Sequence, residues 1–353
     1  MIYREAGQFK TSYAADQQIF PIRQDRYAMA GLLVAAFLII PLTASDYWLT
    51  AILIPFLILS LAALGLNILT GYTGQLSLGS AAFMAVGAFA AFNFVLRVPG
   101  MPILIAFILA GLTAALVGIA FGLPSLRIKG FYLAVATLAA QFFIEWALIK
   151  FGWFSNYNAS GVINAQRIEI LGYELSTPRS KYLLTLSIVA LLALAAKNLA
   201  RSRTGREWMA VRDMDIAAEV IGIHIFKAKL LAFAVSSFYC GVAGALWAYA
   251  YLGSVEPAAF TLERSFQILF MIIIGGVGTV LGSFLGAGFI VLLPIVLSVA
   301  VQAIPGLSRD LLSNLQLIVF GALIIFFLVA EPHGLARLWQ ITKEKLRLWP
   351  FPH

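Results

Sequence analysis

Apolar runs long enough to cross a lipid bilayer follow one another along almost the whole chain. A spanning helix needs about 20 apolar residues, because the bilayer core is roughly 30 Å thick and a helix rises ~1.5 Å per residue. Only 11% of the residues are charged, against about a quarter in a typical soluble domain. Since helices satisfy their own backbone hydrogen bonds in lipid, the pattern predicts an all-α polytopic membrane protein.

About ten transmembrane helices are expected. They lie near residues 28–44, 48–69, 76–96, 101–123, 131–150, 182–199, 228–252, 265–280, 282–301 and 311–330. The tract from Ser265 to Val301 would be roughly 55 Å long as a single helix, which exceeds the bilayer core. We therefore expect the chain to turn at the glycines of this tract, which are Gly275, Gly276, Gly278 and Gly282.

The basic residues favour one side of the membrane. If the N-terminus lies in the cytosol, most of the 24 lysine and arginine residues fall in cytosolic segments, in agreement with the positive-inside rule. The expected organisation is a cytosolic N-terminal tail, 1–27, a transmembrane domain, 28–330, and a cytosolic C-terminal tail, 331–353. The net charge of +8 then reflects topology and contact with membrane lipid, and does not indicate a nucleic-acid partner.

One charged, helix-patterned segment, Thr204–Lys229, interrupts the apolar runs. Thr204 can cap a first short helix, and Gly222 suits the left-handed residue that ends a second one. Both charge signs accompany apolar residues here, as in a segment that binds a groove on a partner, so we interpret 204–222 as a pair of coupling helices. The alternative is an amphipathic loop resting on lipid headgroups. The candidate docking residues are Gly205, Arg206, Trp208, Arg212, Asp213, Ala217, Glu219 and Gly222.

A turn rich in glycine and polar residues, 67–80, lies at membrane depth. Polar atoms there must bond one another or line water, so a broken helix facing a solute path is one interpretation. Close helix packing through small residues is an equally supported alternative. The candidate path or hinge residues are Asn67, Gly71, Gly74, Gln75, Ser77 and Ser80, together with Gly275, Gly276 and Gly278 of the second glycine-rich segment.

Constellations that catalyse reactions are missing from the sequence pattern. There is no Cys/His cluster with metal-ligand spacing and no P-loop pattern for binding ATP. Ionisable residues are almost absent from the interior of the expected spans. Glu145 is the exception, and it could simply reach the interface at the outer end. A membrane enzyme and an ion-coupled secondary transporter, which usually needs intramembrane carboxylates, are therefore less favoured alternatives.

Two segments resemble a known family. The stretch 65–83, GLNILTGYTGQLSLGSAAF, and the stretch 205–223, with GREWMAVRD followed by AAEVIGI, are similar to the signature and the cytosolic coupling loop of LivM-type permeases. These proteins are membrane subunits of branched-chain amino acid ABC importers. The similarity runs from about residue 48 to 331. Ser80 stands where members of the family often have histidine, so a titrating group at that position is not expected here.

The resemblance implies a ten-helix permease in a bacterial cytoplasmic (inner) membrane, with spans 2–5 and 7–10 forming an inverted repeat. The implied partners are a second homologous permease, two cytosolic ATP-binding subunits, and a periplasmic or lipid-anchored solute-binding protein. ATP and Mg would then be bound by the ATPase subunits, with no cofactor on this chain. The expected cargo is branched-chain or other hydrophobic amino acids; urea, amides or aromatic acids are the alternatives within the same class of importer.

Overall fold

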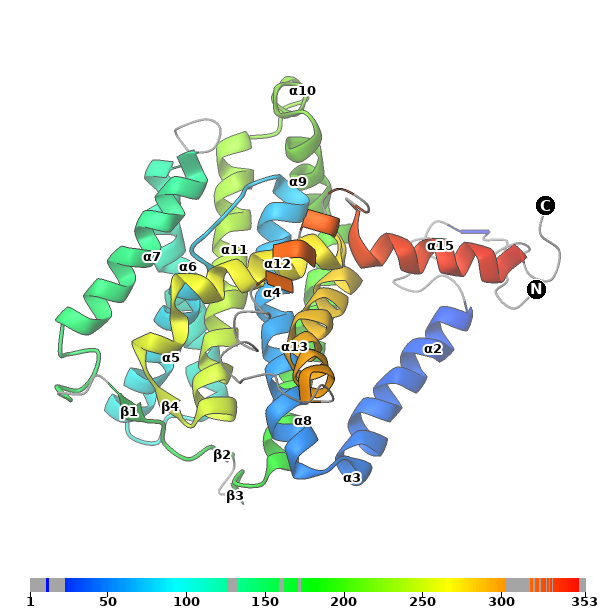
Figure 1. The fold of residues 1–353 in the computed structure, drawn as a ribbon. Coiled ribbons are helices and arrows are strands. Elements are labelled where there is room, and N and C mark those ends of the chain that lie inside the picture. The colour runs from blue at the N-terminus through cyan, green and yellow to red at the C-terminus, as the bar shows by residue number, and fades with distance from the viewer. Residues whose placement is uncertain are drawn as a thin grey trace.

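The structure is a computed structural model that describes residues 11–12, 23–125, 132–158, 162–170, 173–302 and, with single-residue gaps, 318–348. These residues fold almost entirely into helices, arranged as a bundle with a short helical tip at one end and small strands at the other (Figure 1). The fold class predicted from the apolar runs is confirmed.

The long helices are α2 (Arg23–Val34), α4 (Ile54–Thr73), α5 (Ser80–Arg97), α6 (Ile103–Ser125), α7 (Tyr132–Lys150), α8 (Pro178–Arg201), α11 (Ile225–Leu246), α12 (Leu262–Gly275), α13 (Val280–Gln302) and α15 (Gly334–Leu348). The short helices are α3 (Ile40–Thr43), α9 (Arg203–Asp213) and α10 (Asp215–Val220). Three π-helical segments, η1 (Ala35–Ile39), η2 (Trp48–Leu53) and η3 (Trp247–Leu252), and the 3₁₀ turn η4 (Pro257–Phe260) extend the long helices. Two antiparallel pairs join strand β1 (Ile163–Asn164) to β4 (Ser254–Val255) and β2 (Glu169–Ile170) to β3 (Tyr173–Glu174).

Nine helices in the described part of the chain are long and apolar enough to span a membrane, and they match the first nine expected spans. The turn expected in the long apolar tract is confirmed, since α12 ends at Gly275 and α13 begins at Val280. Most of the tenth expected span, 311–330, lies outside the described residues. The inverted repeat of spans 2–5 and 7–10 therefore stays a prediction.

Helix α11 lies at the centre of the bundle and packs against α4, α5 and α6. Small residues allow this because a helix backbone can approach closely only where no side chain intervenes. A Cβ atom added at Gly244 of α11 would overlap the carbonyl of Met84 on α5, and one added at Gly87 of α5 would overlap Gly241 of α11. The two helices thus meet backbone to backbone.

The outer faces of the bundle are apolar. Large hydrophobic side chains that are more than two-fifths exposed include Leu112 and Leu116 on α6, Phe142 on α7 and Leu191 on α8. In water such surface would favour association, whereas lipid tails solvate it. The exposed belt agrees with a chain that crosses a membrane several times.

The two tails differ from the sequence-based expectation. Helix α2 already begins at Arg23, inside the tail expected at 1–27, and most of that tail lies outside the described residues. The C-terminal tail contains an amphipathic helix, α15, which the sequence reasoning did not predict. Lys343 Nζ of α15 lies 3.3 Å from Asp25 Oδ1 of α2, so an ion pair joins the two tails.

Candidate functional site

Helices α9 and α10 form the tip of the bundle, at the end opposite the strands (Figure 1). The expected pair of short helices within 204–222 is thus present, with extended backbone at Met214 between them. The expected cap is wrong by two residues: Ser202 caps α9, because its Oγ accepts a hydrogen bond from the Gly205 N–H at 3.3 Å. Gly222 has φ of +91°, so the left-handed stop predicted there is confirmed.

The base of α9 is anchored within the chain. Trp208 is 1% exposed, and its Nε1 donates to the Ala228 carbonyl at the start of α11 over 3.0 Å. Gly205 is buried at the bend between α8 and α9, where a Cβ would overlap the carbonyl of Ala200. Both residues were candidates for docking, but both are buried against other residues of this chain. They fix the direction in which α9 leaves the bundle.

The surface of the tip is apolar and exposed. Met214, Ile216, Val220 and Ile221 are 67%, 71%, 83% and 73% exposed. The predicted docking residues Arg206, Asp213, Ala217, Glu219 and Gly222 are exposed as well. The sequence reasoning missed the four large apolar residues. The signal was available for Ile216 and Val220, because a six-residue helix in the pattern DIAAEV cannot bury all its apolar side chains against one neighbour.

Arg212 connects the tip to the bundle. Its Nη1 donates to the Gly71 carbonyl near the end of α4 at 2.8 Å, and its Nε lies 2.8 Å from Asp213 Oδ1. A Cβ atom added at Gly74, the residue that ends α4 with φ of +69°, would lie 3.2 Å from Arg212 Cγ. Arg212 therefore contacts the bundle while it is also exposed, and its predicted role in docking stays a prediction.

Asn67 joins α4 to the turn between α12 and α13. Its Nδ2 donates to the Thr279 carbonyl at 2.8 Å and to Ser283 Oγ at 2.9 Å, while its Oδ1 accepts from the Gly278 N–H at 2.8 Å. Asn67 is fully buried. A Cβ atom at Gly71 would overlap Gly278, so the two predicted glycine segments meet here. We call Asn67, Gly71, Arg212 and Gly278 the glycine junction.

The remaining predicted path residues are packed in the described conformation. Gln75 is 6% exposed, and its Nε2 donates to Thr73 Oγ1 at 2.8 Å and to the Lys229 carbonyl at 3.3 Å. Ser77 and Ser80 are each 2% exposed. Gly275 and Gly276 contact α13 and the start of α15, respectively. These contacts describe tight packing at the breaks 74–79 and 276–279, and whether the residues line a path remains a prediction.

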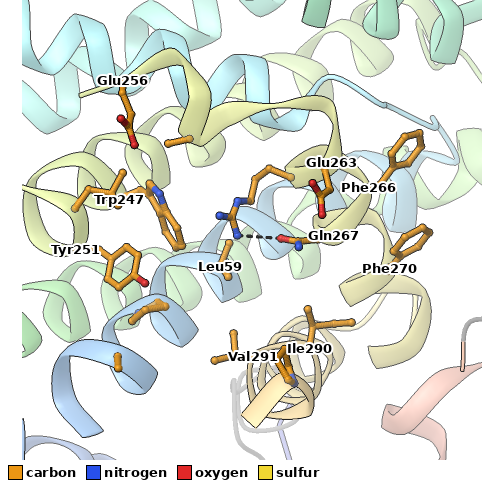
Figure 2. A pocket seen from close by; sticks show the side chains of 16 residues that line it. Leu59, Trp247, Tyr251, Glu256, Glu263, Phe266, Gln267, Phe270, Ile290 and Val291 are labelled. Carbon is orange, nitrogen blue, oxygen red and sulfur yellow. Dashed lines mark hydrogen bonds between the residues drawn. The ribbon is translucent and has the colours of Figure 1, made fainter. Parts of the chain in front are cut away.

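A cavity of about 970 Å³ lies elsewhere, between η2–α4, η3, α12 and α13. Figure 2 shows Trp247 and Tyr251 on one side, Phe266 and Phe270 on the other, and Glu263 and Gln267 between them. None of the predicted path residues lines it. Arg264 does, and its Nη1 donates to Gln267 Oε1 at 2.9 Å.

Arg264 directly precedes the span expected at 265–280, but the apolar helical segment Pro257–Gly275 includes it. The expectation that Glu145 is the exception among the residues inside the spans is therefore wrong. The missed signal was the pair Glu263–Arg264 directly followed by an apolar helix pattern. Among the described residues, no group of three or more His, Cys, Asp or Glu side chains could hold a metal ion.

A family model described as the permease component of the branched-chain amino acid transport system matches residues 48–328. The chain is 27% identical over 350 residues to the high-affinity branched-chain amino acid transport system permease protein LivM of Salmonella typhimurium strain LT2, covering 93% of this chain and 77% of that protein. It is 29% identical over 308 residues to the Escherichia coli K12 protein of the same name, covering 81% and 68%.

A shorter similarity, 28% identity over 147 residues, relates it to the autoinducer 2 import system permease protein LsrC of Enterobacter sp. strain 638, covering 40% of this chain and 41% of that protein. No solved structure matches the chain significantly. The relatives are named as permease subunits of transport systems and not as enzymes. Because the family model covers most of the chain and nine described helices can span a membrane, this multi-pass membrane protein belongs to the family of branched-chain amino acid transport system permeases.

Proposed function

We propose that this chain is a translocation subunit of an ATP-driven ABC importer for branched-chain or other hydrophobic amino acids. In this proposal it pairs with a second homologous permease, receives solute from a periplasmic or lipid-anchored binding protein, and lies in the bacterial inner membrane with both termini cytosolic. ATP and Mg are bound by two separate ATPase subunits. The names of the relatives support the amino-acid cargo.

The observation that carries the proposal is the exposed apolar tip formed by α10 and the two residues that flank it. The four large apolar side chains of this short segment are each about two-thirds or more exposed. An exposed apolar surface on a segment outside the membrane-spanning helices marks a contact with another protein. Its acidic neighbours, Asp213 and Glu219, make a helix-in-groove contact more fitting than binding to anionic headgroups.

Force applied to the tip has a direct route into the bundle. Because Trp208 and Gly205 anchor the base of α9, and Arg212 holds the end of α4, movement of the tip displaces α4. Asn67 then carries the displacement to the turn between α12 and α13. In this mechanism ATP shifts the bundle between two conformations. It can do so because the ATPase subunits bind the tip with a different affinity in each conformation. The glycines at 71, 74, 275, 276 and 278 are the proposed hinges.

The test is co-purification of the ATPase subunits with a charged tip. We expect Ile216→Glu combined with Val220→Glu to leave the chain in the membrane but to abolish capture of the ATPase subunits. Tyr173→Glu is the matched control, because Tyr173 is 79% exposed at the opposite end of the bundle. Full capture of ATPase subunits by the double variant, with uptake intact, would refute the role assigned to α10.

A further inference from the structure

Arg264 occupies an unusual position for a charged side chain. It is half-buried in the wall of the cavity between η3, α12 and α13, within a helical segment apolar enough to span a membrane. An ionisable residue at such a position is unfavourable in lipid, and it usually marks a path for a solute or an ion. None of the ion pairs among the described residues includes Arg264.

The guanidinium group is held in place but keeps donors available. The Gln267 side chain accepts one hydrogen bond, and the guanidinium carbon lies 4.5 Å from the centre of the Trp247 ring. A guanidinium has five N–H donors in a planar fork that matches a carboxylate. The contacts to Gln267 and Trp247 therefore orient Arg264 while leaving the cavity-facing side of the fork able to bind a carboxylate in bidentate form.

The rest of the cavity matches the other parts of an amino acid. Glu256 and Glu263 supply negative charge for an ammonium group, and the aromatic and aliphatic walls supply apolar surface for a side chain (Figure 2). Its volume of about 970 Å³ lies at the upper end of the ~300–1,000 Å³ found for ligand pockets. The cavity can thus hold one amino acid together with water.

One further observation points to a ligand at this place. The π-helical segments η2 and η3 both border the cavity. Because π-helical turns are rare and concentrate at functional sites, their presence on two walls is unexpected for plain packing.

Helix α12 connects this cavity to the glycine junction. Arg264 lies in its first turn, and Gly275 ends it, roughly 16 Å away at ~1.5 Å per residue. The turn that follows is held by Asn67. A displacement of the junction therefore tilts α12 and changes how Arg264 faces the cavity.

We propose that this cavity is the amino-acid transit site of the subunit, with Arg264 binding the carboxylate of the solute and Glu256 and Glu263 facing its ammonium group. The inference rests on the proposed function and adds to it the binding residues and the requirement for a zwitterion. It also favours amino acids over urea and neutral amides, which have no carboxylate to occupy the guanidinium fork.

The test uses the assembled transporter, reconstituted with its partner subunits, and leucine as the probe. In Ala259→Cys, which places a thiol on the cavity wall, a small hydrophilic thiol reagent should label the new cysteine. Cys240, the natural cysteine, is 1% exposed and should stay unlabelled. We expect millimolar leucine to slow the labelling severalfold, and leucinamide and N-acetyl-leucine, each lacking one charge, to slow it far less.

Arg264→Gln should abolish the protection by leucine and lower leucine uptake about tenfold or more, as expected for loss of a charge-assisted hydrogen bond. Arg264→Lys should restore part of both. Arg97→Gln is the matched control, because Arg97 also stacks on a tryptophan, Trp153, at 3.6 Å but lies outside the cavity.

Protection and uptake that survive unchanged in Arg264→Gln would overturn the assignment. So would an Ala259→Cys that is never labelled in the complex, because a partner subunit or lipid would then fill the cavity. Failure of the unaltered transporter to take up any amino acid would instead overturn the proposed function, so the two outcomes are distinguishable.

Discussion

Replacing Asn67 by leucine tests whether the glycine junction holds the bundle together. The substitution keeps the number and branching of the side-chain heavy atoms but removes three hydrogen bonds to the turn after α12, all between 2.8 and 2.9 Å. Side-chain hydrogen bonds in membrane proteins contribute about 0.6 kcal/mol each on average, and an unpaired donor adds ~1 kcal/mol. The free energy of unfolding should therefore fall by roughly 2–3 kcal/mol.

The assay is equilibrium unfolding of the purified chain by denaturant in mixed micelles. Asn93→Leu is the matched control, since Asn93 is also a buried amide but makes one bond within its own helix, to Phe89, and one distant bond, to Phe154 at 3.1 Å. We expect the control to lose about 1 kcal/mol. If Asn67→Leu loses no more than the control, the junction does not hold the two glycine segments together.

Two further predictions concern the route from the tip to the bundle. Gly74→Leu should block uptake while the ATPase subunits stay bound, because a side chain is strained at φ of +69° and the new Cβ would press on Arg212. Unchanged uptake with co-purified ATPase would show that this turn is ordinary packing. Arg212→Ala combined with Glu219→Ala should leave membrane insertion intact but reduce ATP-linked uptake severalfold, because the 2.8 Å hydrogen bond from Arg212 to the Gly71 carbonyl is lost. Full uptake by this variant in vesicles would count against coupling through α9 and α10.

The sequence was most informative where local chemistry dominates. The apolar runs predicted nine helices that the structure contains, and the glycines after residue 274 predicted the turn between α12 and α13. Gly222 was identified as a helix stop for the same reason, since few other residues adopt positive φ. The error at the cap of α9 is a matter of two residues, because Ser202 and Thr204 are both good capping residues and only the backbone path selects between them.

The roles of single side chains depended on contacts that pattern cannot supply. Trp208 and Arg212 were both predicted to contact a partner, yet Trp208 is buried against α11 and Arg212 reaches α4. The apolar composition of α10 indicates that some of its apolar side chains are exposed. It does not show that these are Ile216 and Val220, because that depends on which face of α10 packs against the bundle. Amphipathic periodicity shows that one face of a helix is buried. Only the tertiary structure shows which other helix covers that face.

The sequence alone determined that the chain crosses a membrane many times, where it breaks, and that a polar segment emerges midway, because bilayer thickness and backbone hydrogen bonding act on each segment separately. Only the tertiary structure decided that Asn67 meets Gly278 and that Arg264 faces a cavity with Trp247 and Gln267. Those contacts join residues from separate helices. Their pairing follows from how small residues let the helix backbones approach, which no single segment encodes.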